Sequence, residues 1–340
     1  MELVSIIVPV HNAAHYLEEG VASMMAQDYP NLEFIFVDDC STDNSLAKLH
    51  ELQAKYAQYK IIVAQNERNM GPGPTRNHGF NLSQGKYVYF MDADDYAEPH
   101  LLSTMAQELE RTQADFVMCA YDCHGESTKT YLINPVVLES KTPEAWQRNC
   151  FGFFYAPWTK LVRRSFLLEN KIEFQDLRVA QDLVWTFSMI FAAKHIAFCN
   201  QVLYHYSVYI GSGSHSKSIL KMGDSFRASA ELFKHYHCFE QMKQQLSIFM
   251  TNWCVNNIAV LSPDLQQELL HIFDQTAQEL GLVEPLSAYP FYYRYPCYKL
   301  LPKALGLCKL LRKHWRNMFF HYHDLKELEQ IRQSLAKATT

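Results

Sequence analysis

Three aspartates stand close together at the end of an apolar run. VYFM at 88–91 is followed by Asp92, Asp94 and Asp95, with Ala93 between the first two. Like charges at this spacing repel one another, so a positive group is expected among them. A D-x-D pair supplies the hard carboxylate oxygens that bind Mg²⁺ or Mn²⁺. The alternative interpretation is a solvated acidic turn.

A second acidic pair, Asp38 and Asp39, ends the earlier apolar run NLEFIFVDD at 31–39. In open α/β sheets, ligands bind outside the carboxyl ends of the strands. A carboxylate at such a strand end can accept hydrogen bonds from a base or a ribose, although a helix cap or a turn would also use it. Two acidic strand ends in one domain therefore favour a ligand site.

The loop NMGPGPTRNHGF at 69–80 lies between these acidic groups. Its glycines permit close backbone approach, and the N-terminus of a following helix attracts anions. Arg76 could face a phosphate, pair with the aspartates, or lie on the surface of a glycine-rich connection. The loop is no Walker A motif, because no G-K-[ST] follows, and no dinucleotide fingerprint, because it does not follow the first strand.

Strands alternate with helices through residues 1–120, which predicts an α/β domain with a Rossmann-like, mostly parallel sheet and flanking helices. The apolar run at 182–195 predicts a buried helix, and the pattern is helical from about 219. We therefore expect an α/β domain over 1–215 and a largely helical region over 216–340. The expected strands lie at 3–10, 31–39, 60–66, 86–95 and 114–121, with one or two more over 196–209.

Composition limits the classes further. The chain has 340 residues, 48% of them hydrophobic, and a net charge of -5, which gives no argument for nucleic acid. Nine cysteines with no CxxC pair and no signal peptide predict reduced thiols and a cytoplasmic protein. No apolar run approaches the roughly 20 residues of a membrane-spanning helix.

The segment 285–323 contains no Asp or Glu but has seven Lys or Arg and ten aromatic residues. Basic and aromatic side chains of this kind favour an anionic membrane surface, so peripheral attachment to the inner face of the cytoplasmic membrane is one interpretation. A solvated basic face over an aromatic core is the other.

The succession of VSIIVPVHN, FIFVDDCSTDNS, NMGPGPTRNHG and VYFMDADD resembles the family 2 glycosyltransferases, which have the GT-A fold. The resemblance is strong over 3–100 and weaker to about 215. It implies a nucleotide-diphosphate sugar as donor substrate, a divalent metal (Mn or Mg) and inversion at the anomeric carbon. Residues 1–100 would then bind the nucleotide sugar, and 101–215 would supply the acceptor side and the catalytic base.

The resemblance also implies roles for single residues. Pro9 and His11 match the PxYN turn that walls the nucleobase, with His in place of Tyr. Asp39 matches the aspartate that binds the base, and Asp38 precedes it. Arg76 matches the arginine of the ARN motif.

The segment Asp92, Ala93, Asp94 and Asp95 matches the DxD motif that contacts the diphosphate, with Asp94 and Asp92 as metal ligands. Which of Asp94 and Asp95 is the main ligand stays open.

Asp182 matches the general base of the family, the Asp of an ED pair that opens a buried helix, here with Gln181 in place of Glu. An N-terminal helix carboxylate stabilised by the macrodipole is the alternative. Trp158 and Lys160 lie in a matching WTKL segment, where Trp158 could stack on a sugar or fill the core.

His205 and His215 lie in a segment that resembles the part of the family that folds over the diphosphate. Each could touch phosphate or metal or be structural.

The predicted function is non-processive transfer of one sugar, with UDP as the expected nucleotide, to a lipopolysaccharide, capsule or other surface-glycan acceptor. HWRN at 314–317 is not the QxxRW motif of processive synthases. A nucleotidyltransferase should carry a basic GxG-R-K loop after the first strand, which VPVHNAAHY is not. A non-catalytic relative would not be expected to keep Asp39, Asp92, Asp94 and Asp182.

Overall fold

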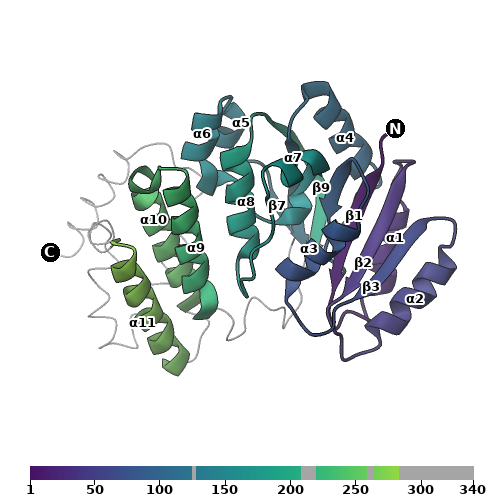
Figure 1. Cartoon of the computed structure of the whole chain (residues 1–340), viewed down its shortest axis with the longest axis horizontal. Helices are drawn as coiled ribbons and strands as arrows, with labels where there is room; N and C mark the ends of the chain where they lie inside the picture. The colour runs from purple at the N-terminus through teal and green to yellow at the C-terminus, as the bar shows by residue number, and fades with distance from the viewer. Residues whose placement is uncertain (125–127, 208–219, 259–262, 283–340) are drawn as a thin grey trace. The chain divides into compact units, whose positions relative to one another are not determined.

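A computed structural model describes residues 1–124, 128–207, 220–258 and 263–282 (Figure 1). The chain divides into two compact units, residues 1–213 and 214–340. His215 and the basic aromatic segment 285–323 lie outside the described residues.

Four parallel strands form one half of the sheet in the first unit, in the order β3-β2-β1-β4. Val10 pairs with Asp38, and Asp38 pairs with Gln65, so the carboxyl ends of three strands meet at one edge. This half is the predicted parallel sheet. The strands are β1 (Val4–Val10), β2 (Leu32–Asp38), β3 (Lys60–Gln65) and β4 (Tyr87–Phe90).

The other half of the sheet makes it mixed. Here β8 pairs antiparallel with β4 and β6, β9 runs parallel to β6, and β5 pairs antiparallel with β9. The short β7 pairs with the end of β6. The α/β class is confirmed. Strands were expected where β6 (Phe116–His124) and β9 (Ile196–Ser207) lie, and the strands that the sequence did not predict are β5 (Tyr96–Ala97), β7 (Lys129–Tyr131) and β8 (Lys160–Arg163).

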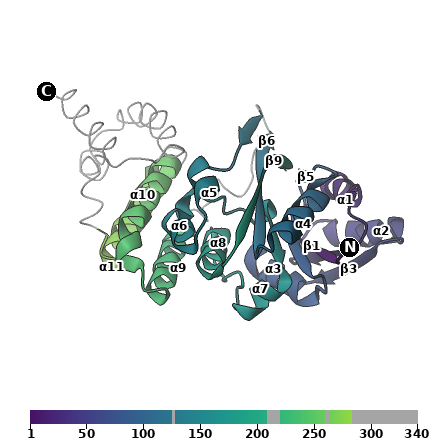
Figure 2. The same cartoon turned by 90° about the horizontal axis from the view of Figure 1, so that it is seen from above.

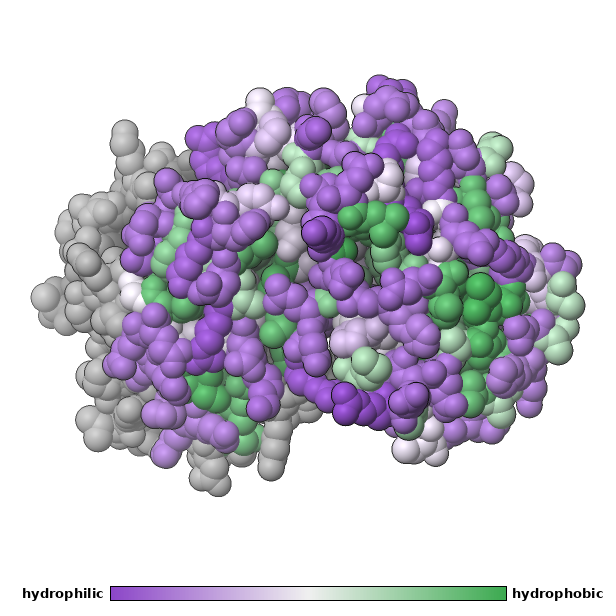
Figure 3. Space-filling view, viewed as in Figure 1, coloured by the Kyte–Doolittle hydropathy of each residue, from purple (hydrophilic) through white to green (hydrophobic). Residues whose placement is uncertain are grey.

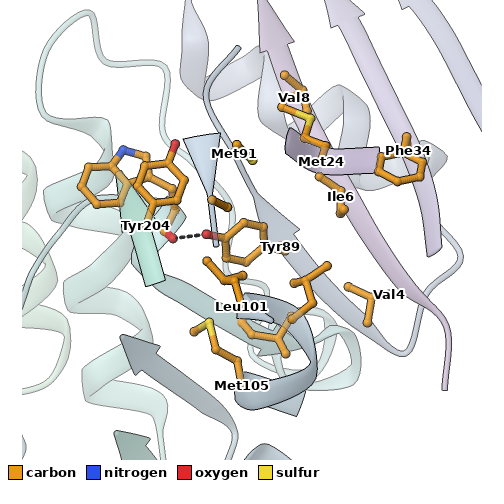
Figure 4. Packing of buried hydrophobic residues seen from close by; sticks show 14 of the residues in the cluster. Val4, Ile6, Val8, Met24, Phe34, Tyr89, Met91, Leu101, Met105 and Tyr204 are labelled. Carbon is orange, nitrogen blue, oxygen red and sulfur yellow. Dashed lines mark hydrogen bonds between the residues drawn. The ribbon is translucent and has the colours of Figure 1, made fainter. Parts of the chain in front are cut away.

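Helices cover both faces of the sheet (Figures 1 and 2). Val4, Ile6 and Val8 of β1 point into a cluster with α1 (Leu17–Met25), α2 (Ser45–Lys55) and α4 (Leu101–Thr112). Figure 4 shows this packing, with Met24, Leu101 and Met105 against the strand side chains. The opposite face of β1 and β2 packs on α3 (Pro72–Leu82). Side chains that alternate along each strand therefore serve two separate helical layers.

The remaining helices of the first unit follow β7 and β8. The predicted buried helix is α8, with nine buried side chains. These elements are α5 (Pro135–Glu139), α6 (Pro143–Arg148), 3₁₀ turns at Cys150–Gly152 and Pro157–Thr159, α7 (Arg164–Glu169) and α8 (Gln181–Ala192).

The described part of the second unit is helical, as predicted. Helices α9 (Met222–His235), α10 (Phe239–Ile258) and α11 (Pro263–Glu279) pack against one another. Phe226 of α9 contacts the rings of Phe249 and Trp253 in α10. Among the described residues, none of the helices has the length and apolar character that crossing a bilayer requires.

The edge strand β3 is less covered than its neighbours. Its four inner residues, Ile61–Ala64, are all only partly buried. Figure 3 shows hydrophobic side chains gathered over the β2–β3 side of the first unit, within a largely hydrophilic surface.

Candidate functional site

The three aspartates lie in a turn that follows β4, because the strand ends at Phe90. Asp95 is fully buried and tied to β9: the phenol of Tyr204 donates to Oδ2 at 2.6 Å, and the backbone N–H of Ser207 donates to Oδ1 at 2.8 Å. Asp92 keeps 28% of its side chain exposed. The turn therefore has one inward carboxyl group and one carboxyl group that reaches solvent.

Electrostatic crowding in this turn matches the repulsion that its sequence predicts. Burial, with Asp92 beside it, raises the pKa of Asp94 to about 6. Burial and the charges of Asp92 and Asp94 raise the pKa of Asp95, although Ser207 and Tyr204 oppose that shift. These hard oxygen ligands crowd together and gain from a cation, so they fit a divalent metal such as Mn²⁺ or Mg²⁺.

Arg76 of α3 supplies a positive charge next to the acidic turn. It is 5% exposed, and its Nη2 donates to Oδ1 of Asp92 at 2.6 Å. The guanidinium carbon lies 5.5 Å from the centre of the Phe174 ring. The Nε and Nη1 groups are buried without a hydrogen-bond partner. Arg76 therefore pairs with one aspartate, as the sequence suggested, and has further N–H groups for anionic oxygens.

Asp39 anchors the glycine-rich loop. Its Oδ1 accepts from the side chain of Asn66 and from the backbone of Met70, each at 2.8 Å, and its Oδ2 accepts from the N–H of Gly71 at 2.8 Å. Gly71 has φ 87°, a conformation that glycine adopts without strain. The carboxylate thus fixes the loop before α3, and its contact with a nucleobase stays a prediction.

Asp38 ends β2 and is fully buried. Its Oδ2 accepts from the N–H of Ser41 at 3.1 Å and from the side chain of Gln65 at 3.2 Å, while its Oδ1 is buried without a partner. Asp38 therefore links the ends of β2 and β3.

The turn after β1 lies beside the same loop. His11 is exposed, with Nδ1 2.9 Å from the carbonyl oxygen of Asp39 and Nε2 3.1 Å from the side-chain nitrogen of Asn69. Pro9 pairs with Val37 in the sheet, two residues before Asp39. The predicted nucleobase wall and the predicted base-binding aspartate are thus brought together.

Asp182 is the second residue of α8. Phe174, which precedes this helix, stacks on Trp185 at 4.6 Å and exchanges two hydrogen bonds with Asn77 of α3. These contacts join the start of α8 to the helix that carries Arg76. Burial raises the pKa of Asp182, and the positive charge of Arg76 is the largest opposing influence. The candidate base therefore lies within electrostatic reach of the arginine that binds the acidic turn.

Lys160 is fully buried, and its ammonium group donates to the carbonyl oxygens of Phe154 and Ala156 and to Oγ1 of Thr159, at 2.5, 3.0 and 3.0 Å. Burial lowers its pKa to about 7, and the nearby Asp182 opposes that shift. Lys160 thus holds the backbone of residues 154–156 in place through these hydrogen bonds, close to the candidate base. Its contact with an acceptor stays a prediction.

Trp158 is 6% exposed, and its ring stacks on those of Tyr204 and Tyr206 at 4.3 and 5.6 Å. It therefore contributes to the aromatic packing behind the acidic turn, and its stacking on a sugar stays a prediction.

His205 lies on β9, next to Tyr204, and contacts carboxylates: Nδ1 is 2.7 Å from Asp122 and Nε2 is 3.0 Å from Glu98.

The sequence did not predict that Tyr204 and Ser207 would be the two residues that hold Asp95. Their position could have been found only from the pairing of β9 with β5.

Comparisons with known proteins agree with this geometry. A sequence model of the family described as "Glycosyl transferase family 2" matches residues 5–180. The chain is 29% identical over 254 residues to the uncharacterized glycosyltransferase YibD of Escherichia coli K12, covering 72% of this chain and 70% of that protein. It is 28% identical over 227 residues to the poly(ribitol-phosphate) beta-N-acetylglucosaminyltransferase TarS of Staphylococcus aureus Mu50, covering 65% of this chain and 38% of TarS.

Solved structures give the same fold. The crystal structure of S. aureus TarS 1–349 in complex with UDP-GlcNAc is similar with a TM-score of 0.70 and 22% identity, over 93% of this chain and 92% of that one. The mannosyltransferase PcManGT of Pyrobaculum calidifontis, in complex with GDP-Man and Mn²⁺, is similar with a TM-score of 0.51 and 16% identity, over 91% of this chain and 86% of that one.

Proposed function

The chain belongs to the family 2 glycosyltransferases, and on this premise we propose that it transfers one sugar from a UDP-sugar to a hydroxyl of a surface-glycan acceptor, with inversion at the anomeric carbon. The observation that carries this proposal is the position of Arg76, which pairs with Asp92 and acts electrostatically on Asp182. One buried cation thus connects the acidic turn to the candidate base. The UDP-GlcNAc complex of TarS supports the choice of nucleotide.

Asp94 and Asp92 would hold the divalent cation, and Asp95 would position the turn. Both oxygens of Asp95 already accept hydrogen bonds from β9, and the residue is fully buried. Asp94 is less buried, and its raised pKa reflects a carboxylate that gains from a nearby positive charge. The bound metal, Mn or Mg, supplies Lewis-acid stabilisation of the departing diphosphate; the Mn²⁺ complex of PcManGT is consistent with this.

Arg76 would add a second positive charge at the diphosphate. Its buried Nε and Nη1 groups need hydrogen-bond acceptors, and phosphate oxygens match the fork of a guanidinium. A group held in advance by Asp92 and Phe174 loses little entropy on binding.

Asp182 would remove the proton from the acceptor hydroxyl as its oxygen attacks the sugar. A buried carboxylate has a higher proton affinity than an exposed one, and the raised pKa of Asp182 makes it a stronger base. The nucleobase would lie against Pro9 and His11, beside the loop that Asp39 fixes.

The acceptor belongs to the surface glycans in this proposal, such as lipopolysaccharide or capsule, or is a glycolipid. The transfer of sugars to poly(ribitol-phosphate) by TarS supports a cell-surface polymer. The basic aromatic segment 285–323 would attach the enzyme to the inner face of the cytoplasmic membrane, where a lipid-linked acceptor lies.

A thermal-shift panel of UDP-, GDP-, CMP- and dTDP-sugars, each with Mn²⁺ and with EDTA, tests the proposal. We expect a UDP-sugar to raise Tm most, and only with Mn²⁺. The sugar that binds is then tested for Mn²⁺-dependent release of UDP. Stabilisation by another nucleotide sugar would overturn the UDP assignment, and stabilisation without any turnover would indicate a binding protein.

A further inference from the structure

Three metal-ligating side chains meet at the ends of β6 and β9, outside the site described above. One ligand atom each from Asp122, His124 and His205 lie within 4.8 Å of one another. Oδ1 of Asp122 is 2.7 Å from Nδ1 of His205 and 2.9 Å from Nε2 of His124. A carboxylate oxygen and two imidazole nitrogens therefore already converge on one point.

Strand geometry sets this cluster apart from the acidic turn. Asp122 pairs with His205 and His124 pairs with Ser207 in the parallel β6–β9 ladder. Successive side chains of a strand point to opposite faces. Tyr204 and Tyr206 stack on Trp158 on one face, so His205 between them points to the other.

The surroundings of the cluster suit a bound ion. The side chains of Asp122 and His205 are 13% and 14% exposed, while that of His124 is 37% exposed, which leaves a route for entry. Nε2 of His124 is buried without a well-aligned hydrogen bond, although Oδ1 of Asp122 lies 2.9 Å away. An ion bound by both atoms would satisfy this nitrogen.

Glu98 provides an outer contact that metal-binding histidines commonly have. Its Oε1 is 3.0 Å from Nε2 of His205, and the ring of Tyr96 stacks on the same imidazole at 5.1 Å. A carboxylate that accepts a hydrogen bond from Nε2–H leaves the lone pair of Nδ1 free to bind the metal, and it fixes the orientation of the ring. Glu98 is therefore a positioning residue.

We propose that Asp122, His124 and His205 bind a zinc-type divalent ion, through a carboxylate oxygen, Nε2 of His124 and Nδ1 of His205. Zn²⁺ takes imidazole nitrogen together with carboxylate oxygen, whereas Mg²⁺ and Ca²⁺ prefer ligand sets made only of oxygen. The chain thus has two cation sites with different preferences. An ion bound at the second site would join β6 to β9, the strand that holds Asp95 through Tyr204 and Ser207.

Calorimetric titration of Zn²⁺ into the full-length, reduced protein in excess Mg²⁺ tests this site. We expect about one equivalent of Zn²⁺ to bind, with at least a tenfold loss of affinity in His124→Ala and in His205→Ala. His235→Ala, at an exposed histidine of α9, serves as the matched control, and Asp94→Asn should keep the Zn²⁺ site. Unchanged affinity in both cluster variants would overturn the proposal.

Two further measurements keep the test decisive if a variant is less stable. Circular dichroism establishes that His124→Ala is folded, and Zn²⁺ should raise Tm of the parent protein but not of this variant. Co²⁺ should give an absorption spectrum without a thiolate charge-transfer band. Such a band would assign the ion to cysteine, with Cys123 the neighbouring thiol, and would contradict the assigned ligands.

Discussion

The phenol of Tyr204 donates a 2.6 Å hydrogen bond to Oδ2 of Asp95, while its oxygen lies 3.4 Å from the backbone nitrogen of Asp92. One side chain of β9 therefore contacts both ends of the acidic turn. This relationship gives the aspartates different surroundings, because Asp95 is turned inward to the protein whereas Asp92 and Asp94 are only partly buried.

Replacement of Tyr204 by Phe should remove its hydrogen bond to this turn while the aromatic ring still fills the core. A hydrogen bond contributes about 0.5 to 1.5 kcal/mol between neutral groups and about 1.5 to 3 kcal/mol to a charged group, so we expect the free energy of unfolding to fall by about 0.5 to 3 kcal/mol. The affinity for the donor sugar should fall as well, measured by calorimetry. Tyr206→Phe is the matched control, since Tyr206 stacks on Trp158 from the same strand. Equal effects of the two changes would contradict a special role for Tyr204.

Asp94→Asn should weaken the binding of Mn²⁺ and donor sugar yet stabilise the metal-free protein. The folded-state pKa of about 6 lies above the ordinary value of 3.8, so this carboxyl group costs stability that grows as pH rises from about 4 to 6. We expect a gain of about 1 to 2 kcal/mol at pH 7 in EDTA, discounted for partial solvent screening.

The gain from Asp94→Asn should shrink as pH falls from about 6 and vanish at about pH 3, below the ordinary pKa of 3.8, where the folded and unfolded proteins both bind the proton. Chemical denaturation at the two pH values measures it. A loss of stability at pH 7 would contradict the cost in stability assigned to the Asp94 carboxylate.

Asp182→Asn should abolish transfer, because the amide cannot accept the acceptor proton. Loss of a general base costs about 10² to 10⁴ in rate. Donor affinity, measured by calorimetry, should stay within a few-fold of the parent protein. Asp176→Asn, at an exposed aspartate ahead of α8, is the control and should retain activity. Near-normal turnover of Asp182→Asn would place the base elsewhere.

The rate of transfer should fall at low pH along an acid limb set by Asp182. Its folded pKa is raised by burial, so the carboxylate becomes protonated, and inactive as a base, at a pH above the usual aspartate range. Profiles of kcat against pH at saturating Mn²⁺ measure the limb. Removing the Arg76 charge by Arg76→Gln should move it to still higher pH, and a shift in the opposite direction would refute their electrostatic coupling.

The basic segment 285–323 should bind anionic membranes. Each Lys or Arg near such a surface contributes about 1 kcal/mol, and salt screens the attraction. Cosedimentation with phosphatidylserine vesicles should fall on deletion of 285–340 and at high salt, while vesicles of phosphatidylcholine bind neither form. Undiminished binding after the deletion would exclude this segment as the anchor.

Local patterns predicted the parallel half of the sheet, because each strand there is a compact apolar run between helix signals. The same patterns missed β8. Its four residues, KLVR, pair with β4 and β6, which are distant in sequence, and only that pairing makes them a strand. Strand pairing between distant segments leaves no local period in the sequence.

The candidate site was predictable to the same extent. The pairing of Arg76 with Asp92 was one of three interpretations that the sequence left open, and the clustered negative charge favoured a positive group in this place. The link between His205, Asp122 and His124 did not, since it depends on the parallel register of β6 and β9. Of these three residues the sequence indicated only His205, and the fold was needed to identify Asp122 and His124 as its partners.

Gly20 of α1 lies against the acidic turn, where a methyl group in place of its hydrogen would overlap the carbonyl oxygen of Ala93 and approach the carbonyl oxygen of Asp95 at 3.4 Å. Helix α1 thus limits how the turn can be placed, and β9 fixes the turn through its hydrogen bonds to Asp95. A methyl group added at Gly20 would therefore push the acidic turn away from α1. The carboxylates of Asp92 and Asp94 would move relative to Arg76, although no charge in the molecule would change.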